Sequence, residues 1–342
     1  MYQPFTTPAA WRVGDLGCAY SFAYELSSRE RSALLDALKA CASLPLAALT
    51  PATFPLALES LPHWVDEVKT GRGLVWLRNM PVDELDPEEA GRLFFGLGSY
   101  FGTAVSQSND GELVGHVINV GGQDPRERAY RNARQLQLHT DRCDYIGMLC
   151  LRPAATGGVS GYASALTIHN EILATRPHLM DTLYQGFHLH RFGETIDGPP
   201  ITPAPIPVFS VTDGVPNIVY IRGYIDLAVD EGHYELTSVQ AQALDYFDEV
   251  SNRPDIRLDL ALEPGDATLT NNCVLLHRRT AFEDHEDAAR RRHLLRLWLM
   301  DPDLPACAAV LAHKSMKGIE KIAGRGTYYQ GPGYTDEHAP AE

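Results

Sequence analysis

The stretch Leu136-Gln137-Leu138-His139-Thr140-Asp141 carries the strongest signal in this chain of 342 residues. If it is extended, His139 and Asp141 lie two positions apart and project from the same face. An imidazole and a carboxylate can then converge on one cation. A third ligand is needed from elsewhere, and His277 is the candidate because it follows a strand-like run over 267–276.

Two histidines and one carboxylate on one face of an octahedral metal leave three positions open, an arrangement typical of non-haem Fe(II) oxygenases. Other residues compete for a place in such a site. Asp144 lies close in sequence, and His188 and His190 form a separate H-x-H pair. Ordinary half-exposed strand residues are the simpler interpretation of that pair.

Arginines follow the third candidate ligand on a strand predicted over 293–300. In a strand Arg292, Arg296 and Trp298 share one face, and an inward arginine needs an anion because burying an unpaired charge is costly. Four strand residues span roughly 13 Å, so the two arginines do not grip one small carboxylate together. We therefore expect one to bind a dicarboxylate co-substrate and the other a second anionic group. Two surface arginines on an edge strand are the alternative.

Composition limits the class of protein. Lys and Arg number 29 against 44 Asp and Glu, giving a formal charge of −15, which argues against a nucleic-acid partner. No run approaches the roughly 20 apolar residues of a membrane span, and the N-terminus does not resemble a secretory signal. The six cysteines are scattered. These features predict a cytoplasmic protein with a small-molecule substrate and no membrane partner, and leave a homo-oligomer open.

The pattern of elements favours a β-rich fold. Helices are predicted over 27–41, 86–97, 166–175 and 237–250, and strands over 113–120, 145–151, 217–221, 267–276 and 293–300. Because they do not alternate as βαβ units, an antiparallel sheet or barrel with added helices is favoured over a doubly wound sheet. The sequence contains no dinucleotide-binding or P-loop motif that would support a doubly wound sheet.

The motifs together, and in this order, resemble the TauD/TfdA branch of the Fe(II)/2-oxoglutarate-dependent dioxygenases, in the clavaminate synthase-like superfamily. They are His139-x-Asp141, Gly157-Gly158-Val159-Ser160, Pro264-Gly265-Asp266, His277-x-Arg279 and Arg292-x-x-x-Arg296. The resemblance implies a mainly β, cupin-like jelly-roll core (a double-stranded β-helix) with flanking helices. It also implies one domain over 1–342, with a mostly helical part over 1–105 and an irregular tail over 324–342.

The same resemblance implies a set of site residues. His139, Asp141 and His277 would bind Fe(II), while Arg292 and Ser160 would bind the distal carboxylate of 2-oxoglutarate. Arg296 would face the cofactor or the substrate. The candidates for the substrate wall are His116, Asn119, Gln135 and Gln137, although core packing is the simpler reading of His116.

The implied reaction uses O2 to oxidise an unactivated C–H bond of a small anionic or amino-acid-like substrate, releasing succinate and CO2. The carboxylate of Asp141 favours hydroxylation over halogenation, for which relatives carry a small residue there. Desaturation or ring closure in a natural-product pathway is one alternative. A non-catalytic jelly-roll binding protein is another. A zinc hydrolase with the same ligands is the third, but it leaves the Gly-Gly-Ser segment and the arginine pair unexplained.

Overall fold

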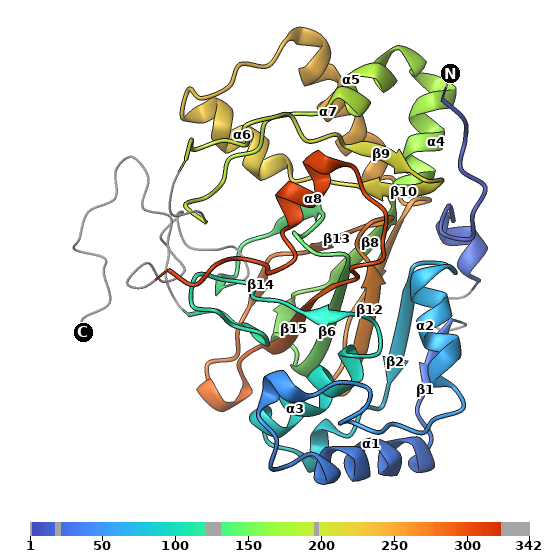
Figure 1. Ribbon diagram of the computed structural model, residues 1–342, viewed down its shortest axis with the longest axis vertical. Coiled ribbons are helices and arrows are strands. Elements are labelled where there is room, and N and C mark those ends of the chain that lie inside the picture. Colours follow the sequence, from blue (N-terminus) through green and yellow to red (C-terminus); the bar gives the residue numbers. More distant parts are fainter. Residues whose placement is uncertain (1, 18–21, 121–130, 195–197, 323–342) are drawn as a thin grey trace.

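Two β-sheets face each other at the centre of the computed structural model, which describes residues 2–17, 22–120, 131–194 and 198–322 (Figure 1). The larger sheet contains, in spatial order, β1 (Ala23–Glu25), β2 (Leu74–Arg78), β12 (Ala267–Asn271), β6 (Tyr145–Arg152), β15 (His293–Met300) and β3 (Thr103–Ala104), with β4 (Gly115–Val117) also beside β15. The smaller sheet contains β11 (Arg257–Leu260), β8 (Ser160–Ser164), β13 (Leu275–Arg279) and β5 (Leu136–His139). Two ribbons pair β9 (Phe209–Thr212) with β10 (Val215–Ile218) and β7 (Thr156–Gly157) with β14 (Phe282–Glu283).

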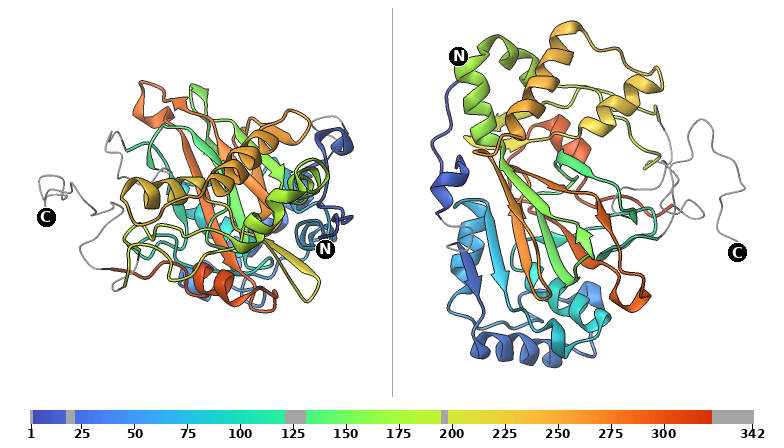
Figure 2. Two further views of the ribbon diagram at one scale, coloured as in Figure 1. Left: turned by 90° about the horizontal axis from the view of Figure 1, so that it is seen from above. Right: turned by 180° about the vertical axis from the view of Figure 1, so that it is seen from behind.

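Helices gather at the two ends of these sheets (Figures 1 and 2). At one end lie α1 (Ser28–Ala40), α2 (Leu61–Lys69) and α3 (Pro87–Gly98), and at the other α4 (Ala165–Thr175), α5 (Met180–Gln185), α6 (Arg222–Asp230) and α7 (Ser238–Ser251). The last described helix is α8 (Ala308–Lys314). Single 3-10 turns lie at Val13–Leu16, Leu46–Ala48, Val82–Glu84, Pro177–Leu179 and Ala288–Arg290.

The pleat of β15 separates the two faces of the larger sheet. Leu295, Leu297 and Leu299 are fully buried in the core that α1, α2 and α3 share with the sheet. Residues of opposite parity, among them Arg296 and Trp298, therefore point to the other side, toward the smaller sheet. A core-forming strand thus also delivers polar side chains into the space between the sheets.

Helix starts follow the capping residues seen in the sequence. Ser27 accepts a hydrogen bond from the backbone N–H of Glu30, whose carboxylate accepts one from the Ser27 N–H in return, and α1 begins at the next residue. Asp86 caps α3 and Thr237 caps α7 in the same reciprocal way. The four predicted helices are confirmed to within two residues at each end.

Some predicted boundaries are wrong. The run over 267–276 is two strands, because β12 ends at Asn271 and the chain crosses to the smaller sheet before β13 begins. The strand predicted over 113–120 shortens to β4, and that over 217–221 ends at Ile218, close to the start of α6. Residues 1–105 contain α1, α2 and α3 but also supply β1, β2 and β3 to the larger sheet. The predicted tail, 324–342, lies outside the described residues.

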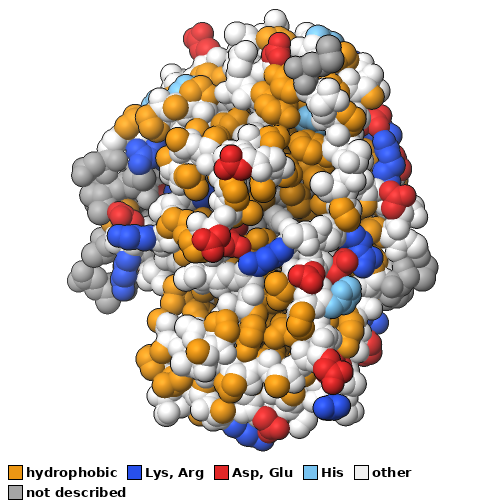
Figure 3. All heavy atoms as spheres, turned by 45° about the vertical axis from the view of Figure 1, so that its right-hand side comes forward, with side chains coloured by type: hydrophobic (Ala, Val, Ile, Leu, Met, Phe, Trp, Pro, Cys, Tyr) orange, Lys and Arg blue, Asp and Glu red, His pale blue; other side chains and the backbone are white. Residues whose placement is uncertain are grey.

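Surface chemistry agrees with the composition. On the face shown in Figure 3, acidic and basic side chains are interspersed among apolar ones and are not gathered into one basic patch. Within the described ranges, every helix is too short or too polar to cross a lipid bilayer.

Candidate functional site

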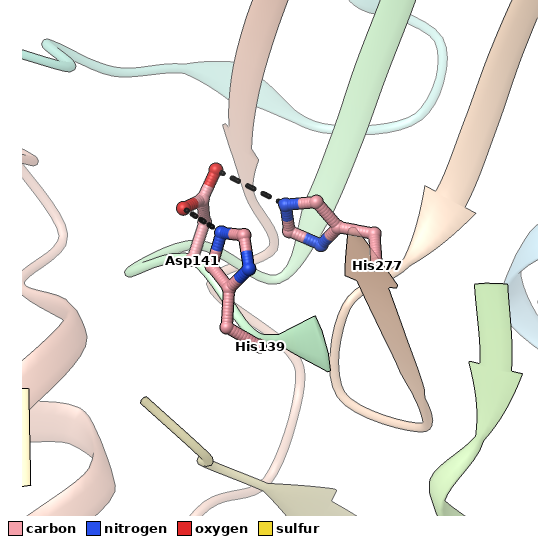
Figure 4. Close-up of side chains that lie close together, drawn as sticks. All are labelled: His139, Asp141 and His277. Atoms are coloured by element: carbon pink, nitrogen blue, oxygen red, sulfur yellow. Dashed lines mark ion pairs between the residues drawn. The ribbon is translucent and has the colours of Figure 1, made fainter. Parts of the chain in front are cut away.

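Three side chains from two neighbouring strands point toward one another (Figure 4). His139 ends β5, Asp141 follows it by two residues, and His277 lies in β13. β5 and β13 are antiparallel, and His139 lies directly opposite His277 in their register. Asp141 follows the end of β5, with one carboxylate oxygen 3.6 Å from His139 Nε2 and the other 3.7 Å from His277 Nε2. One ligand atom from each residue lies within 4.8 Å of the other two, which leaves room for an ion between them.

The protonation of these groups suits a metal. His139 donates its Nδ1 hydrogen to the Gln137 carbonyl at 2.7 Å, which leaves the Nε2 lone pair facing Asp141. Burial and the neighbouring His139 lower the pKa of His277 to about 3, so its ring is neutral. Burial opposes ionisation of Asp141, but Arg296 and the two histidines hold the pKa of this carboxyl well below its ordinary value. The neutral imidazole of His277, the Nε2 atom of His139 and the carboxylate of Asp141 are thus presented together.

A second cluster of possible metal ligands contains a histidine whose tautomer does not offer a lone pair to a metal. His190 and His233 each place Nε2 within 3.3 Å of one oxygen of Glu231. However, His190 Nδ1 accepts a hydrogen bond from the Phe192 backbone N–H at 3.0 Å, so the ring hydrogen stays on Nε2 and is donated to Glu231. This cluster is therefore a hydrogen-bonded group, and the His188-x-His190 pair does not contribute to the first site.

Polar neighbours fix the loop that carries Asp141. Asn272 accepts the Asp141 backbone N–H at 2.9 Å and donates to the Asp141 carbonyl at 2.8 Å. The carboxylate oxygen Oδ2 accepts the Trp298 indole N–H at 2.7 Å and an Arg296 N–H at 3.3 Å. Arg296 is itself held by Gln107, whose amide oxygen accepts its Nε–H at 2.7 Å.

A cavity opens beside the three ligands, with about 540 Å³ of space that includes its mouth. It is lined by Val117, Leu136, His139, Ile146, Met148, Ser160, Tyr162, Thr270, His277, Arg278, Arg279, Arg292 and Arg296. Two of the candidate metal ligands, His139 and His277, therefore share one cavity with Ser160 and both predicted anion-binding arginines, and Asp141 lies beside the two histidines.

Arg292 is a buried cation presented to this cavity. It is 2% exposed, its guanidinium lies 4.9 Å from the Phe282 ring centroid, and within the described part of the chain its Nη1 has no hydrogen-bond partner. Burial lowers the pKa of Arg292 to about 10, and it remains charged near neutrality. A buried cation with an unused N–H requires an anion.

The Gly157-Gly158 pair makes room for this arginine. Both residues have positive φ, 72° and 68°, a region that favours glycine. A Cβ on Gly158 would lie 3.1 Å from Arg292 Nε, and one on Gly157 would lie 2.1 Å from the Ala281 carbonyl oxygen. The motif therefore has a steric reason: it lets the backbone pass close to Arg292.

Arg279, from the His277-x-Arg279 motif, has a different environment. It is 4% exposed, its guanidinium also lies 4.9 Å from the Phe282 ring centroid, and it donates to the carbonyls of Asn132 and Arg134. These contacts anchor the segment that leads into β5. Arg279 therefore supports the strand that carries His139.

The four predicted wall residues lie beside the cavity lining, not in it. Gln135 and Gln137 are exposed, whereas Leu136 and His139 both line the cavity although they differ in strand parity, because the register of β5 against β13 shifts between them. Val117 lines it from β4, whereas His116 hydrogen-bonds His293 at 2.8 Å and Asn119 lies beyond the strand. The predicted contact of these four residues with a substrate stays a prediction.

Sequence reasoning did not identify several residues of the site. Trp298 was placed on the right face, but only the arginines of that face received a role. Gln107 and Asn272 carry no local motif that would reveal them. Thr270 lines the cavity, and its buried hydroxyl has no hydrogen-bond partner among the residues that the structure describes.

Comparison with known proteins identifies the family. The family described as "Taurine catabolism dioxygenase TauD, TfdA family" matches residues 42–298. FR-33289 synthase of Streptomyces rubellomurinus (strain ATCC 31215) is 31% identical over 308 residues, covering 87% of this chain and 90% of that protein. Uridine-5'-phosphate dioxygenase of a Streptomyces species is 30% identical over 214 residues, 59% of this chain and 74% of that protein.

A solved structure has the same fold. Asparagine oxygenase in complex with Fe(II), 2S,3S-3-hydroxyasparagine and succinate matches with a TM-score of 0.64 at 18% identity, over 82% of this chain and 93% of the other. This likeness confirms the predicted jelly-roll core with flanking helices. The family match covers most of the chain and confirms the resemblance inferred from the motifs. The chain belongs to the TauD, TfdA family of Fe(II)- and 2-oxoglutarate-dependent dioxygenases.

Proposed function

We propose that this protein hydroxylates an unactivated C–H bond of a small anionic or amino-acid-like substrate. The observation that carries the proposal is a cluster of three metal-competent ligands, two of which line a cavity that also contains a buried arginine requiring an anion. His139, Asp141 and His277 hold Fe(II), and Arg292 with Ser160 binds the distal carboxylate of 2-oxoglutarate. When bound, these groups supply O2 activation, and 2-oxoglutarate leaves as succinate and CO2 while the substrate gains a hydroxyl.

The residues of the chain supply charge and geometry. Arg292 neutralises the co-substrate carboxylate in a site from which bulk water is largely removed, since it is 2% exposed. Arg296, at 7% exposure, lies nearer the metal ligands and contacts Asp141. Its predicted contact with a cofactor or substrate anion stays a prediction. We further propose that residues 1–342 act as one domain, because β2 from the first 105 residues pairs with β12.

Relatives guide the choice of substrate. One is named for uridine-5'-phosphate and a structural neighbour for asparagine, so anionic and amino-acid substrates both occur around this fold. Purified protein with Fe(II), 2-oxoglutarate and ascorbate should release succinate in a substrate-dependent way when amino acids, sulfonates, nucleoside monophosphates and carrier-bound acyl groups are screened. Product mass should rise by one oxygen atom. A product that instead loses two hydrogens would replace hydroxylation with desaturation or ring closure.

Arg292→Ala is expected to raise the KM for 2-oxoglutarate about 10- to 100-fold, since a hydrogen bond to a charged group contributes roughly 1.5–3 kcal/mol. The KM should be measured by succinate release at saturating substrate. Arg291→Ala is the matched control, because Arg291 is the exposed neighbour, and it should leave the KM unchanged. If Arg296→Ala raises this KM and Arg292→Ala does not, the roles of the two arginines are reversed.

A further inference from the structure

Trp298 makes one polar contact that the family motifs do not explain. Its indole N–H donates to Asp141 Oδ2 at 2.7 Å, and its ring is 3% exposed. The pleat of β15 places Trp298 two residues after Arg296, on the same side of the sheet. A buried indole N–H generally needs a partner, and here that partner is a candidate metal ligand.

The two oxygens of Asp141 have different surroundings. Oδ2 accepts from Trp298 and, at 3.3 Å, from Arg296, which together use both of its lone pairs. Oδ1 lies 3.6 Å from His139 Nε2 and Oδ2 lies 3.7 Å from His277 Nε2, so the distances to the imidazoles do not distinguish the two oxygens. The hydrogen bonds from Trp298 and Arg296 do distinguish them, because both end on Oδ2. The donors are therefore all on one oxygen.

We propose that Trp298 is a positioning residue that holds Oδ2 of Asp141 away from the metal, so that the carboxylate binds through Oδ1 alone. This inference rests on the proposed function, because it assumes that the three ligands bind iron. The consequence concerns how many coordination positions of the metal stay open. Three single-atom ligands leave three of six positions open, whereas a carboxylate binding through both oxygens would take one of them. The co-substrate and O2 together need all three.

Trp298 also supports Arg296, the second hydrogen-bond donor to Oδ2 of Asp141. The Arg296 guanidinium lies 4.9 Å from the Trp298 ring centroid, and Gln107 holds its Nε–H from the other direction. The indole thus contributes a direct hydrogen bond to the carboxylate and a surface on which the charged donor rests. A phenyl ring in its place keeps much of that surface but removes the N–H.

Trp298→Phe is expected to weaken Co(II) binding 10- to 100-fold, the usual effect of losing a group that orients a metal ligand. Affinity should be measured by competition with a chromophoric chelator, and the visible ligand-field bands of the Co(II) protein should shift. The matched control is Trp11→Phe, which also removes a buried indole hydrogen bond, to the Arg72 carbonyl at 2.9 Å, far from these ligands in the chain. It should change neither the affinity nor the bands.

The outcomes separate the two proposals. If wild-type protein does not take Co(II) from the chelator, the metal site itself is wrong. If wild type binds but Trp298→Phe has the same affinity and the same bands, only the role of Trp298 is overturned. Should Trp298→Phe lose its circular dichroism, 3-benzothienylalanine at this position replaces the N–H with sulfur at nearly equal ring volume. The same loss of affinity and band shift are then expected, and their absence overturns the inference.

Discussion

His277→Ala should abolish the visible charge-transfer band that forms when Fe(II) and 2-oxoglutarate are added anaerobically to the wild-type protein. His277 is one of three groups whose ligand atoms lie within 4.8 Å of one another, so its removal leaves two ligands. Even the loss of a group that only orients a ligand weakens metal binding 10- to 100-fold. Losing a ligand itself should therefore reduce both Fe(II) affinity and succinate release by at least about 100-fold.

A matched histidine tests whether this effect is specific. His190 is buried and, like His277, has a carboxylate close to its Nε2: that of Glu231, at 3.2 Å. Because its Nδ1 accepts a backbone hydrogen bond, its Nε2 keeps a proton and is not offered to a metal. His190→Ala should thus retain the band and the Fe(II) affinity. A band that survives His277→Ala, or is lost equally in both variants, would rule out the assigned ligand set.

The convergence of His139 and Asp141 was predictable because its signal is local. The two residues are two positions apart, and the strand pleat needs no knowledge of the rest of the fold to bring them together. His277 also lies beside them, although the strand predicted to carry it was wrong: His277 lies in β13 of the smaller sheet. Its place opposite His139 comes from sheet register. That these three residues bind iron stays a prediction.

The cavity wall and the residues around Asp141 were harder to predict. The register of β5 against β13 shifts between Leu136 and His139, so strand parity alone does not tell which side chains line the cavity: Leu136 and His139 do, whereas Gln135 and Gln137 do not. Asn272 reaches Asp141 across 131 positions of sequence and Trp298 across 157. Such contacts depend on how β12 and β15 lie beside the ligand loop, which no spacing rule contains.

Replacing one buried lysine should strongly destabilise the protein. Lys314, at the end of α8, has a side chain only 1% exposed, and its ammonium donates to Asp144 at 2.9 Å, Asn217 at 3.0 Å and Cys273 at 3.0 Å. Burial opposes its charge, but Cys273 and Asp144 hold the pKa of Lys314 above its ordinary value. Lys314→Met should lower the free energy of unfolding by about 3–5 kcal/mol, because it leaves the buried Asp144 carboxylate without its cation. Urea unfolding followed by circular dichroism measures this loss.

Two further variants show whether the uncompensated charge is the cause. Lys39→Met removes an exposed lysine 3.9 Å from Asp36 and should change the free energy of unfolding by no more than about 0.5 kcal/mol. Adding Asp144→Asn to Lys314→Met should recover part of the lost stability, since the unpaired charge is then gone. If the double variant is less stable than Lys314→Met, burial of an unpaired carboxylate is not the reason for the loss.

Asp144 follows Asp141 by three residues, and its carbonyl accepts the backbone N–H of Asn272, the residue that hydrogen-bonds the Asp141 backbone. A loosened Asp144 should therefore also weaken Fe(II) binding in Lys314→Met, whereas Lys39→Met should bind Fe(II) as the wild type does.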